Sequence, residues 1–346
     1  QVQSTTVTSR VRLSFTADLP ALGYQVYRLR PAGTAEPFVT VSASDGVLEN
    51  ARFRLEIDTE TGYVARLYDK QAGVDVFTGD AALPAVLEDT SDTWGHNTFK
   101  YDKVIGAFIA TSVALVEHGP VKSVIRVMSA YERSSLVQDF TMYPNRDQID
   151  VHVTVNWQEQ FRMLKLRFPV NVKFMQVTTE TAYGHIAYAA NGEEAPFQSW
   201  VDVSGTSRDK EITYGFSLLN DAKYSLDVNV RDIGLTVLRS PAYAHHIPAT
   251  IQPQQHYAFI DQGIQRFSYS MLAHTGSWED AGTVRRAAEL NQRPSALFAT
   301  FHPDGTLPQA DSFIDVQPAN VLVSVLKQAE DNDDLIIRAY ETAKVA

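Results

Sequence analysis

The sequence predicts a mostly β protein built as a large antiparallel β-sandwich, with a small N-terminal β segment and one short helix. Three observations lead to this fold class. Apolar and polar residues alternate with a period of two in many short segments, most clearly over residues 119–170. Residues with turn chemistry separate these segments, as in 143–147 (YPNRD). A single segment, 278–290, has the spacing and flanking residues of a helix.

The N-terminal residues already read as strand material. Alternation runs over Arg10–Phe15 and again over Leu22–Leu29, and the first residue is Gln rather than Met. We therefore expect the chain to be the C-terminal part of something longer. Residues 1–40 would be a small β segment that belongs to a preceding domain, and residues 41–346 would form the main β-sandwich.

A hairpin and an irregular loop follow. Ala51–Ile57 and Tyr63–Tyr68 alternate on either side of a turn that ends in Gly62, where positive φ costs least. After another turn, Val74–Phe77 is a further strand. Residues 79–100 then break the periodicity with small, acidic and aromatic residues, and such a loop is a common place for function.

The central stretch, residues 119–170, predicts an antiparallel meander of three or four strands. Val121–Met128, Gln148–Trp157 and Arg162–Phe168 all show the period of two. Charged side chains on these strands indicate one buried face and one wetter face: Arg126, Glu132, Asp150, Lys165 and Arg167. A wet β face can dock sugars, although it is more often the outside of a sandwich.

The C-terminal half continues with strands, one helix and a last hairpin. The expected strands are Thr178–Tyr188, Trp200–Val203, Ile212–Leu219, Leu235–Leu238, Tyr257–Ile260 and Gln265–Leu272, with a loop over 220–232. For the helix at 278–290, Ser277 and Asp280 approximate a capping box and Pro294 stops the helix. Residues 319–341 form the final hairpin around the turn 331–334.

Composition excludes several classes of function. Lys and Arg number 30 against 41 Asp and Glu, and the net charge of −11 argues against binding a phosphate backbone. We expect neither a nucleic-acid partner nor a membrane partner, because no apolar run approaches the length of a membrane span. With no cysteine there is no disulfide framework and no thiolate ligand or nucleophile, and we expect a cytoplasmic protein.

Motifs for catalysis or metal binding are absent from the sequence. No H-x-H, H-E-x-x-H or G-x-S-x-G pattern occurs, and the adjacent His245 and His246 would point to opposite faces of a strand. We therefore predict no catalytic residue and no metal ligand within this chain. Among the aromatic residues Trp94 stands out, since it lies in the irregular loop beside Asp92, His96 and Asn97.

The chain resembles the C-terminal β region of the glycoside hydrolase family 38 α-mannosidases. The segments that carry this resemblance, in order along essentially the whole chain, are 19–29, 49–77, 87–97, 119–170, 195–205, 214–241, 261–278 and 327–342. The resemblance implies a zinc-dependent, retaining exo-α-mannosidase whose catalytic N-terminal domain is absent here. It also implies a galactose mutarotase-like supersandwich over residues 41–346, and zinc bound by the full-length enzyme but not by this fragment.

The same resemblance suggests the substrate contacts. The loop that holds Asp92, Trp94 and His96, and the arginine of VLRSP, Arg239, are expected to reach the cleft. Relatives read roughly Trp-Asp-Ala-Trp-Asp in this loop, whereas this chain reads DTWGHN over residues 92–97. The implied partners are a mannoside or oligosaccharide substrate and the N-terminal catalytic domain.

Two other readings stay open. A stand-alone carbohydrate-binding β-sandwich would bind sugar by itself, and a mutarotase-like epimerase or a polysaccharide lyase would need a histidine pair such as His245 and His246. A fragment would also expose an apolar patch near its N-terminal segment, through which a homo-oligomer could form.

Overall fold

The computed structural model describes residues 13–30, 39–244, 251–252, 254–299 and 304–344. The chain divides into two compact units, 1–38 with 297–316, and 39–296 with 317–346. The division expected at residue 40 stays a prediction, and residues 297–316 group with the first unit. In that unit β1 (Gly23–Gln25) pairs antiparallel with β22 (Ala310–Ser312). Within the described residues, no helix is long and apolar enough to cross a membrane.

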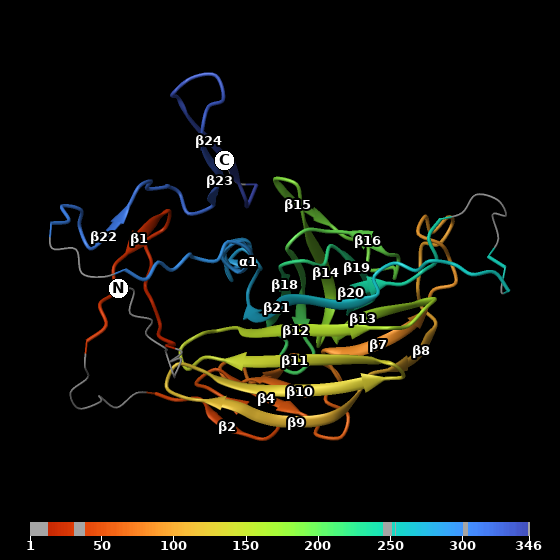
Figure 1. Cartoon of the computed structure of the whole chain (residues 1–346). Coiled ribbons are helices and arrows are strands. Elements are labelled where there is room, and N and C mark those ends of the chain that lie inside the picture. The colour runs from red at the N-terminus through yellow and green to blue at the C-terminus, as the bar shows by residue number, and fades with distance from the viewer. Residues whose placement is uncertain (1–12, 31–38, 245–250, 253, 300–303, 345–346) are drawn as a thin grey trace, which may run out of the picture. The chain divides into compact units, whose positions relative to one another are not determined.

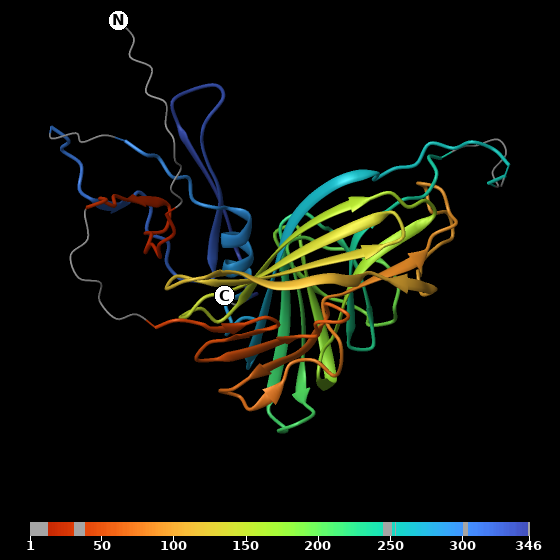
Figure 2. The ribbon, with the colours of Figure 1, turned by 60° about the horizontal axis from the view of Figure 1, so that its bottom comes forward.

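The larger unit is built on a nine-stranded sheet. Its strands, in spatial order, are β15 (Gly184–Ala187), β14 (Val172–Thr181), β17 (Trp200–Ser207), β18 (Thr213–Asn220), β21 (Gly263–Thr275), β12 (Ile149–Trp157), β11 (Ser134–Met142), β10 (Ser123–Tyr131) and β9 (Ile109–His118). Neighbouring strands pair antiparallel, and β9 to β12 run side by side in Figure 1. In Figure 2 the yellow and the green strands run in different directions, so the sheet twists strongly across its width.

Further sheets share the core of this unit. A six-stranded sheet has the order β16 (Ala195–Pro196), β19 (Ser225–Asn229), β20 (Asp232–Arg239), β13 (Arg162–Pro169), β7 (Leu83–Glu88) and β8 (Val104–Ala107). A five-stranded sheet contains β2 (Ser42–Ser44), β3 (Val47–Glu49), β4 (Phe53–Ile57), β5 (Val64–Asp69) and β6 (Val74–Asp75), and β23 (Val321–Gln328) pairs with β24 (Leu335–Glu341). The predicted fold class, a mostly β, antiparallel sandwich, is confirmed.

One apolar core joins the nine-, six- and five-stranded sheets. Strand β12 shows how the period of two produces it, because Val151, Val153 and Val155 are fully buried while His152 between them is exposed. Phe216 of the nine-stranded sheet packs edge-on against Phe77, with ring centroids 4.9 Å apart, and both belong to the same buried cluster as Phe168 of β13. The core is thus a sandwich interior filled from several sheets.

Several predictions about single elements need correction. The central stretch supplies three strands of one sheet, β10, β11 and β12, but β13 belongs to the six-stranded sheet. Lys165 of β13 is fully buried rather than on a wet face. Strands β7 and β19 lie in segments that we expected to be loops, and no strand forms over 257–260.

The helix is confirmed, but it begins later than predicted. Helix α1 spans Thr283–Asn291, with Gly282 at its N-cap in the left-handed region (φ 65°). Ser277 and Asp280 do hydrogen-bond reciprocally, yet they close a turn that precedes the helix. Ala287 is buried and packs with Trp200, Leu219 and Trp278, so the helix covers one end of the large sheet. The final hairpin is confirmed as β23 and β24.

Candidate functional site

The loop that follows β7 is folded back on itself by local hydrogen bonds. The Asp92 carboxylate accepts from the backbone N–H of Trp94 at 2.9 Å and of Gly95 at 3.3 Å, which is the pattern of an Asx turn. Gly95 has φ 59°, a value that suits glycine. The Thr93 N–H donates to the carbonyl of Ala242 at 2.9 Å, so the loop is also fastened to the chain that follows β20.

Arg239, the last residue of β20, is held against this loop by a buried carboxylate. Its Nε donates to Asp89 Oδ2 at 2.8 Å, and its Nη2 donates to Asp89 Oδ1 at 3.2 Å. Nη2 also donates to Ser91 Oγ at 2.7 Å and to the Asp92 carbonyl at 3.5 Å. The Asp89 side chain is 0% exposed and that of Arg239 is 22% exposed. The planar guanidinium is therefore fixed along one edge by a bidentate pair.

Tyr101 completes the support of this arginine. Its ring centroid lies 4.9 Å from the guanidinium carbon of Arg239, the geometry of a cation–π contact. Burial raises the pKa of the Tyr101 hydroxyl, and the positive charge of Arg239 opposes that rise. A neutral phenol is thus packed against a cation whose position is set from two sides.

Trp94 and His96 form the exposed part of the loop. Their rings stack with centroids 5.8 Å apart and planes inclined by 8°, and Trp94 is 61% exposed. The structure therefore brings all four predicted site residues together: Asp92 shapes the turn, Arg239 lies behind it, and the two rings face outward. Their assignment as substrate contacts stays a prediction.

Sequence reasoning missed the residues that position this cluster. Asp89, Ser91 and Tyr101 were not singled out, and Asp89 follows Glu88 at the end of a strand, where an acidic residue is usually solvent-exposed. The Asp89–Arg239 pair joins residues 150 positions apart, and no local pattern reveals such a pair.

A buried charge network beneath the loop was also missed. Lys165 Nζ, 0% exposed, donates to Glu194 and Asp227, and Arg167 donates to Asp227 at 3.1 Å and to Asp232 at 2.8 Å. Burial raises the pKa of the Asp232 carboxyl, and the charge of Arg167 opposes that effect. The signal was present in β13, where a lysine is flanked by apolar residues (MLKL, 163–166).

This network also touches the loop. The Glu194 N–H donates to the carbonyl of Phe99 at 2.8 Å, and Lys100 Nζ donates to the carbonyl of Asn191 at 2.8 Å. The two ends of the loop are therefore fastened separately, one at Asp89 and the other at residues 191–194. The side chains that point outward from such a loop would lose little conformational entropy when a ligand binds.

The cluster is suited to binding rather than to acid–base or metal chemistry. Both of its carboxylates are already occupied, Asp89 by Arg239 and Asp92 by backbone N–H groups. Among the described residues, no group of three or more His, Cys, Asp or Glu side chains is arranged to hold a metal ion. The adjacent His245 and His246, which the epimerase reading would need, lie outside the residues that the structure describes.

Comparison with known proteins gives one consistent family. The model of the "Glycosyl hydrolases family 38 C-terminal domain" matches residues 48–249. Alpha-mannosidase G of Dictyostelium discoideum is 27% identical over 325 residues, 87% of this chain and 28% of that protein. Alpha-mannosidase 2C1 of Homo sapiens is 27% identical over 347 residues, 93% of this chain and 31% of that protein. The chain thus spans less than a third of the length of these curated relatives.

A solved structure shows the same fold. An alpha-mannosidase from Enterococcus faecalis V583 aligns with a TM-score of 0.72 at 15% identity, over 89% of this chain and 38% of that one. At this identity the likeness concerns the fold alone. The family model, however, matches more than half of the 346 residues. The chain therefore belongs to the family of glycosyl hydrolase family 38 C-terminal domains.

Proposed function

We propose that this chain is the C-terminal, non-catalytic part of a zinc-dependent, retaining exo-α-mannosidase that hydrolyses terminal α-mannosides. Its family and the alpha-mannosidases that it resembles over most of its length support this proposal. The observation that carries it is the cluster of Arg239 with the loop of Asp92, Trp94 and His96.

Each part of the cluster has a role in this proposal. Arg239 uses Nε and Nη2 for Asp89 and Ser91, which leaves the Nη1 edge, on the Gly95 side, for hydroxyl groups of a sugar. The exposed Trp94 ring and its stacked partner His96 offer a flat apolar surface with polar edges, which suits a pyranose. The chain supplies one wall of the substrate cleft and the scaffold that holds it.

The chemistry itself is assigned to the N-terminal catalytic domain, which is the proposed partner of this chain. A retaining glycosidase needs a nucleophilic carboxylate and an acid/base carboxylate beside the scissile bond. Asp89 and Asp92 are engaged elsewhere, so they do not supply this pair. Among the described residues, no group of three or more His, Cys, Asp or Glu side chains fits a zinc ion.

We further propose a cytoplasmic location, with which the lack of cysteine is compatible. Large apolar side chains are exposed in residues 13–30, including Leu13, Phe15 and Leu29. They support self-association of the chain when it is studied alone, which analytical ultracentrifugation measures.

The test compares hydrolysis of p-nitrophenyl α-mannoside by this chain and by the polypeptide extended at its N-terminus, each with and without zinc. We expect activity only in the extended, zinc-loaded protein. In that protein Arg239→Met should lower kcat/KM by about ten- to a hundredfold, the effect of losing one charged hydrogen-bond donor. Arg266→Met, which changes an exposed arginine on β21, is the matched control and should change nothing.

Two results would overturn the proposal. Hydrolysis by the 346-residue chain alone would place a catalytic set within it. An extended protein in which Arg239→Met and Arg266→Met behave alike would remove Arg239 from the cleft.

A further inference from the structure

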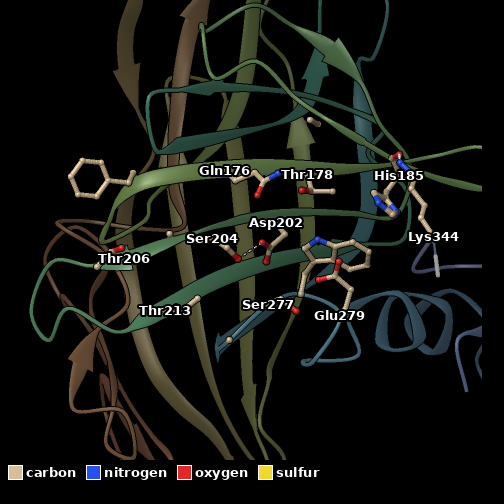
Figure 3. Close-up of a pocket in the computed structure, with 15 residues that line it drawn as sticks. Gln176, Thr178, His185, Asp202, Ser204, Thr206, Thr213, Ser277, Glu279 and Lys344 are labelled. Carbon is tan, nitrogen blue, oxygen red and sulfur yellow. Dashed lines mark hydrogen bonds between the residues drawn. The ribbon is translucent and has the colours of Figure 1, made fainter.

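A pocket of about 560 Å³ lies on the face of the nine-stranded sheet that is turned away from the apolar core. Strands β14, β17 and β18 form its floor, and residues 276–279 after β21 form a wall. Figure 3 shows His185 and Lys344 together at one end. The pocket shares no lining residue with the loop of Trp94 and Arg239, and its volume is within the ~300–1,000 Å³ typical of small-molecule sites.

The floor is polar because two rows of side chains cross the sheet. Pairing places Thr178 opposite Asp202, and Asp202 opposite Ser217. Two residues further along each strand, on the same face of the sheet, the register aligns a second row: Gln176, Ser204, Gly215 and His274. The residues between them, such as Val201 and Val203, belong to the core. Because successive side chains point to opposite faces, the pocket face of these strands is polar and the opposite face is apolar.

Asp202 is the centre of this floor. Its Oδ2 accepts from Ser217 Oγ at 2.7 Å and pairs with His274 Nε2 at 2.8 Å, and its Oδ1 accepts from Ser204 Oγ. The side chain is 1% exposed, yet it borders the pocket. A Cβ at Gly215 would lie 2.5 Å from His274 Cε1, so glycine at this position lets the imidazole reach across β18 to the carboxylate.

Asp202 is not the only polar group on the floor. The Thr178 hydroxyl and the Gln176 amide line the pocket on the same floor as Asp202. Thr206 and Thr213 add further hydroxyls to the lining, whereas the Ser277 hydroxyl is engaged with Asp280. Trp278 supplies an apolar wall, and its orientation is fixed by ring contacts with Trp200 at 4.9 Å and His185 at 4.7 Å.

We propose that this pocket binds a neutral, hydroxyl-rich ligand of the size of one or two pyranose rings, at a site separate from the cluster of Arg239. Hydroxyl and amide groups dominate the lining, and they match a ligand that both donates and accepts. A phosphate or other anion is disfavoured, since Asp202 and Glu279 oppose the charge of Lys344. A cation is disfavoured because both Asp202 oxygens already accept hydrogen bonds.

The test is a saturation-transfer NMR titration of the chain with the methyl α-pyranosides of mannose, glucose and galactose. We expect at least one of them to bind with a millimolar Kd, and glucose 6-phosphate not to bind. Thr178→Val and Gln176→Leu should each weaken binding about three- to tenfold, the effect of one lost hydrogen bond. Thr178→Val keeps the shape of the side chain, and Thr154→Val on β12 of the same sheet is its matched control.

The site and the proposed function can fail independently. Arg266→Met, a substitution outside both the pocket and the loop of Trp94, should leave this binding unchanged. Binding that Trp94→Ala abolishes while Thr178→Val and Gln176→Leu preserve it would assign the sugar to the loop and overturn the proposal. Absence of binding by all three pyranosides, in a protein that melts cooperatively, would overturn it as well.

Discussion

The ion pair between Asp89 and Arg239 should be among the strongest single couplings in the fold. Asp89→Ala would leave the guanidinium, only 22% exposed, without its counter-charge, and Arg239→Ala would leave a fully buried carboxylate. Breaking a buried pair costs about 3–5 kcal/mol. Because Arg239 retains some solvent contact, we expect the free energy of unfolding to fall by about 3 kcal/mol for either substitution.

A double-mutant cycle isolates the pair from its surroundings. In the double variant neither charge is left alone, so the loss should be smaller than the sum of the single losses by about 2 kcal/mol. The assay is equilibrium unfolding in urea, followed by fluorescence and circular dichroism, with the requirement that the slope m is unchanged.

The pair of Arg126 and Asp139 provides the matched control. It has the same bidentate geometry, with both hydrogen bonds at 2.7 Å, but its side chains are 46% and 19% exposed. Exposed pairs contribute about 0.2–1 kcal/mol. If the cycle at Asp89 and Arg239 gave a coupling no larger than the cycle at Arg126 and Asp139, burial would not be the origin of the loop's stability and our reasoning would be refuted.

Three further predictions concern Lys165 in the six-stranded sheet, and Gly215 and His185 in the nine-stranded sheet. Lys165→Met leaves Glu194 without its cation and Asp227 with Arg167 alone, and should cost about 3–5 kcal/mol in urea unfolding; a loss below 1 kcal/mol would contradict the buried network. Gly215→Ala should lower Tm by several degrees, because its Cβ collides with His274, and an unchanged Tm would contradict the packing. Burial, helped by Lys344, lowers the pKa of His185 from 6.5, so the stability due to the neutral ring is present above that pH and is lost as pH falls below it. His185→Gln should therefore flatten the decline of Tm between about pH 7 and 5, and parallel Tm profiles would count against this.

Strands with one wet face carry the clearest signal in the sequence. Strand β12 alternates between fully buried and accessible positions, so its pattern is visible. Strand β7 (LPAVLE) is buried on both faces through its centre and has no alternation, so the sequence pattern does not distinguish it from the loop that follows. Strand β13 was recognised but placed in the wrong sheet, because alternation defines two faces and does not specify the neighbouring strand.

The candidate site shows the same division between local and long-range information. Trp94 and Asp92 could be noticed because they interrupt a periodic pattern, and Arg239 was found only through family resemblance. Their positions depend on contacts between distant segments. Arg239 donates to Asp89, and the backbone N–H of Glu194 donates to the carbonyl of Phe99. Such pairs leave no pattern in a single sequence. A lysine within an apolar strand, as at Lys165, does indicate a buried carboxylate partner.

The buried charges beneath the loop are better explained by orientation than by stability. Replacing a buried ion pair with apolar residues of equal volume is often neutral or stabilising, so stability alone would not require Lys165 or Asp89. Both pairs, however, fix the ends of the segment that carries Trp94, one directly and one through the backbone of Glu194. A binding surface held in this way loses little conformational entropy when a ligand binds. Its side chains are also held in one orientation, because each buried ion pair has a single geometry of lowest energy. We therefore infer that these charges are buried, despite the free energy of desolvation, because they fix the position of the loop.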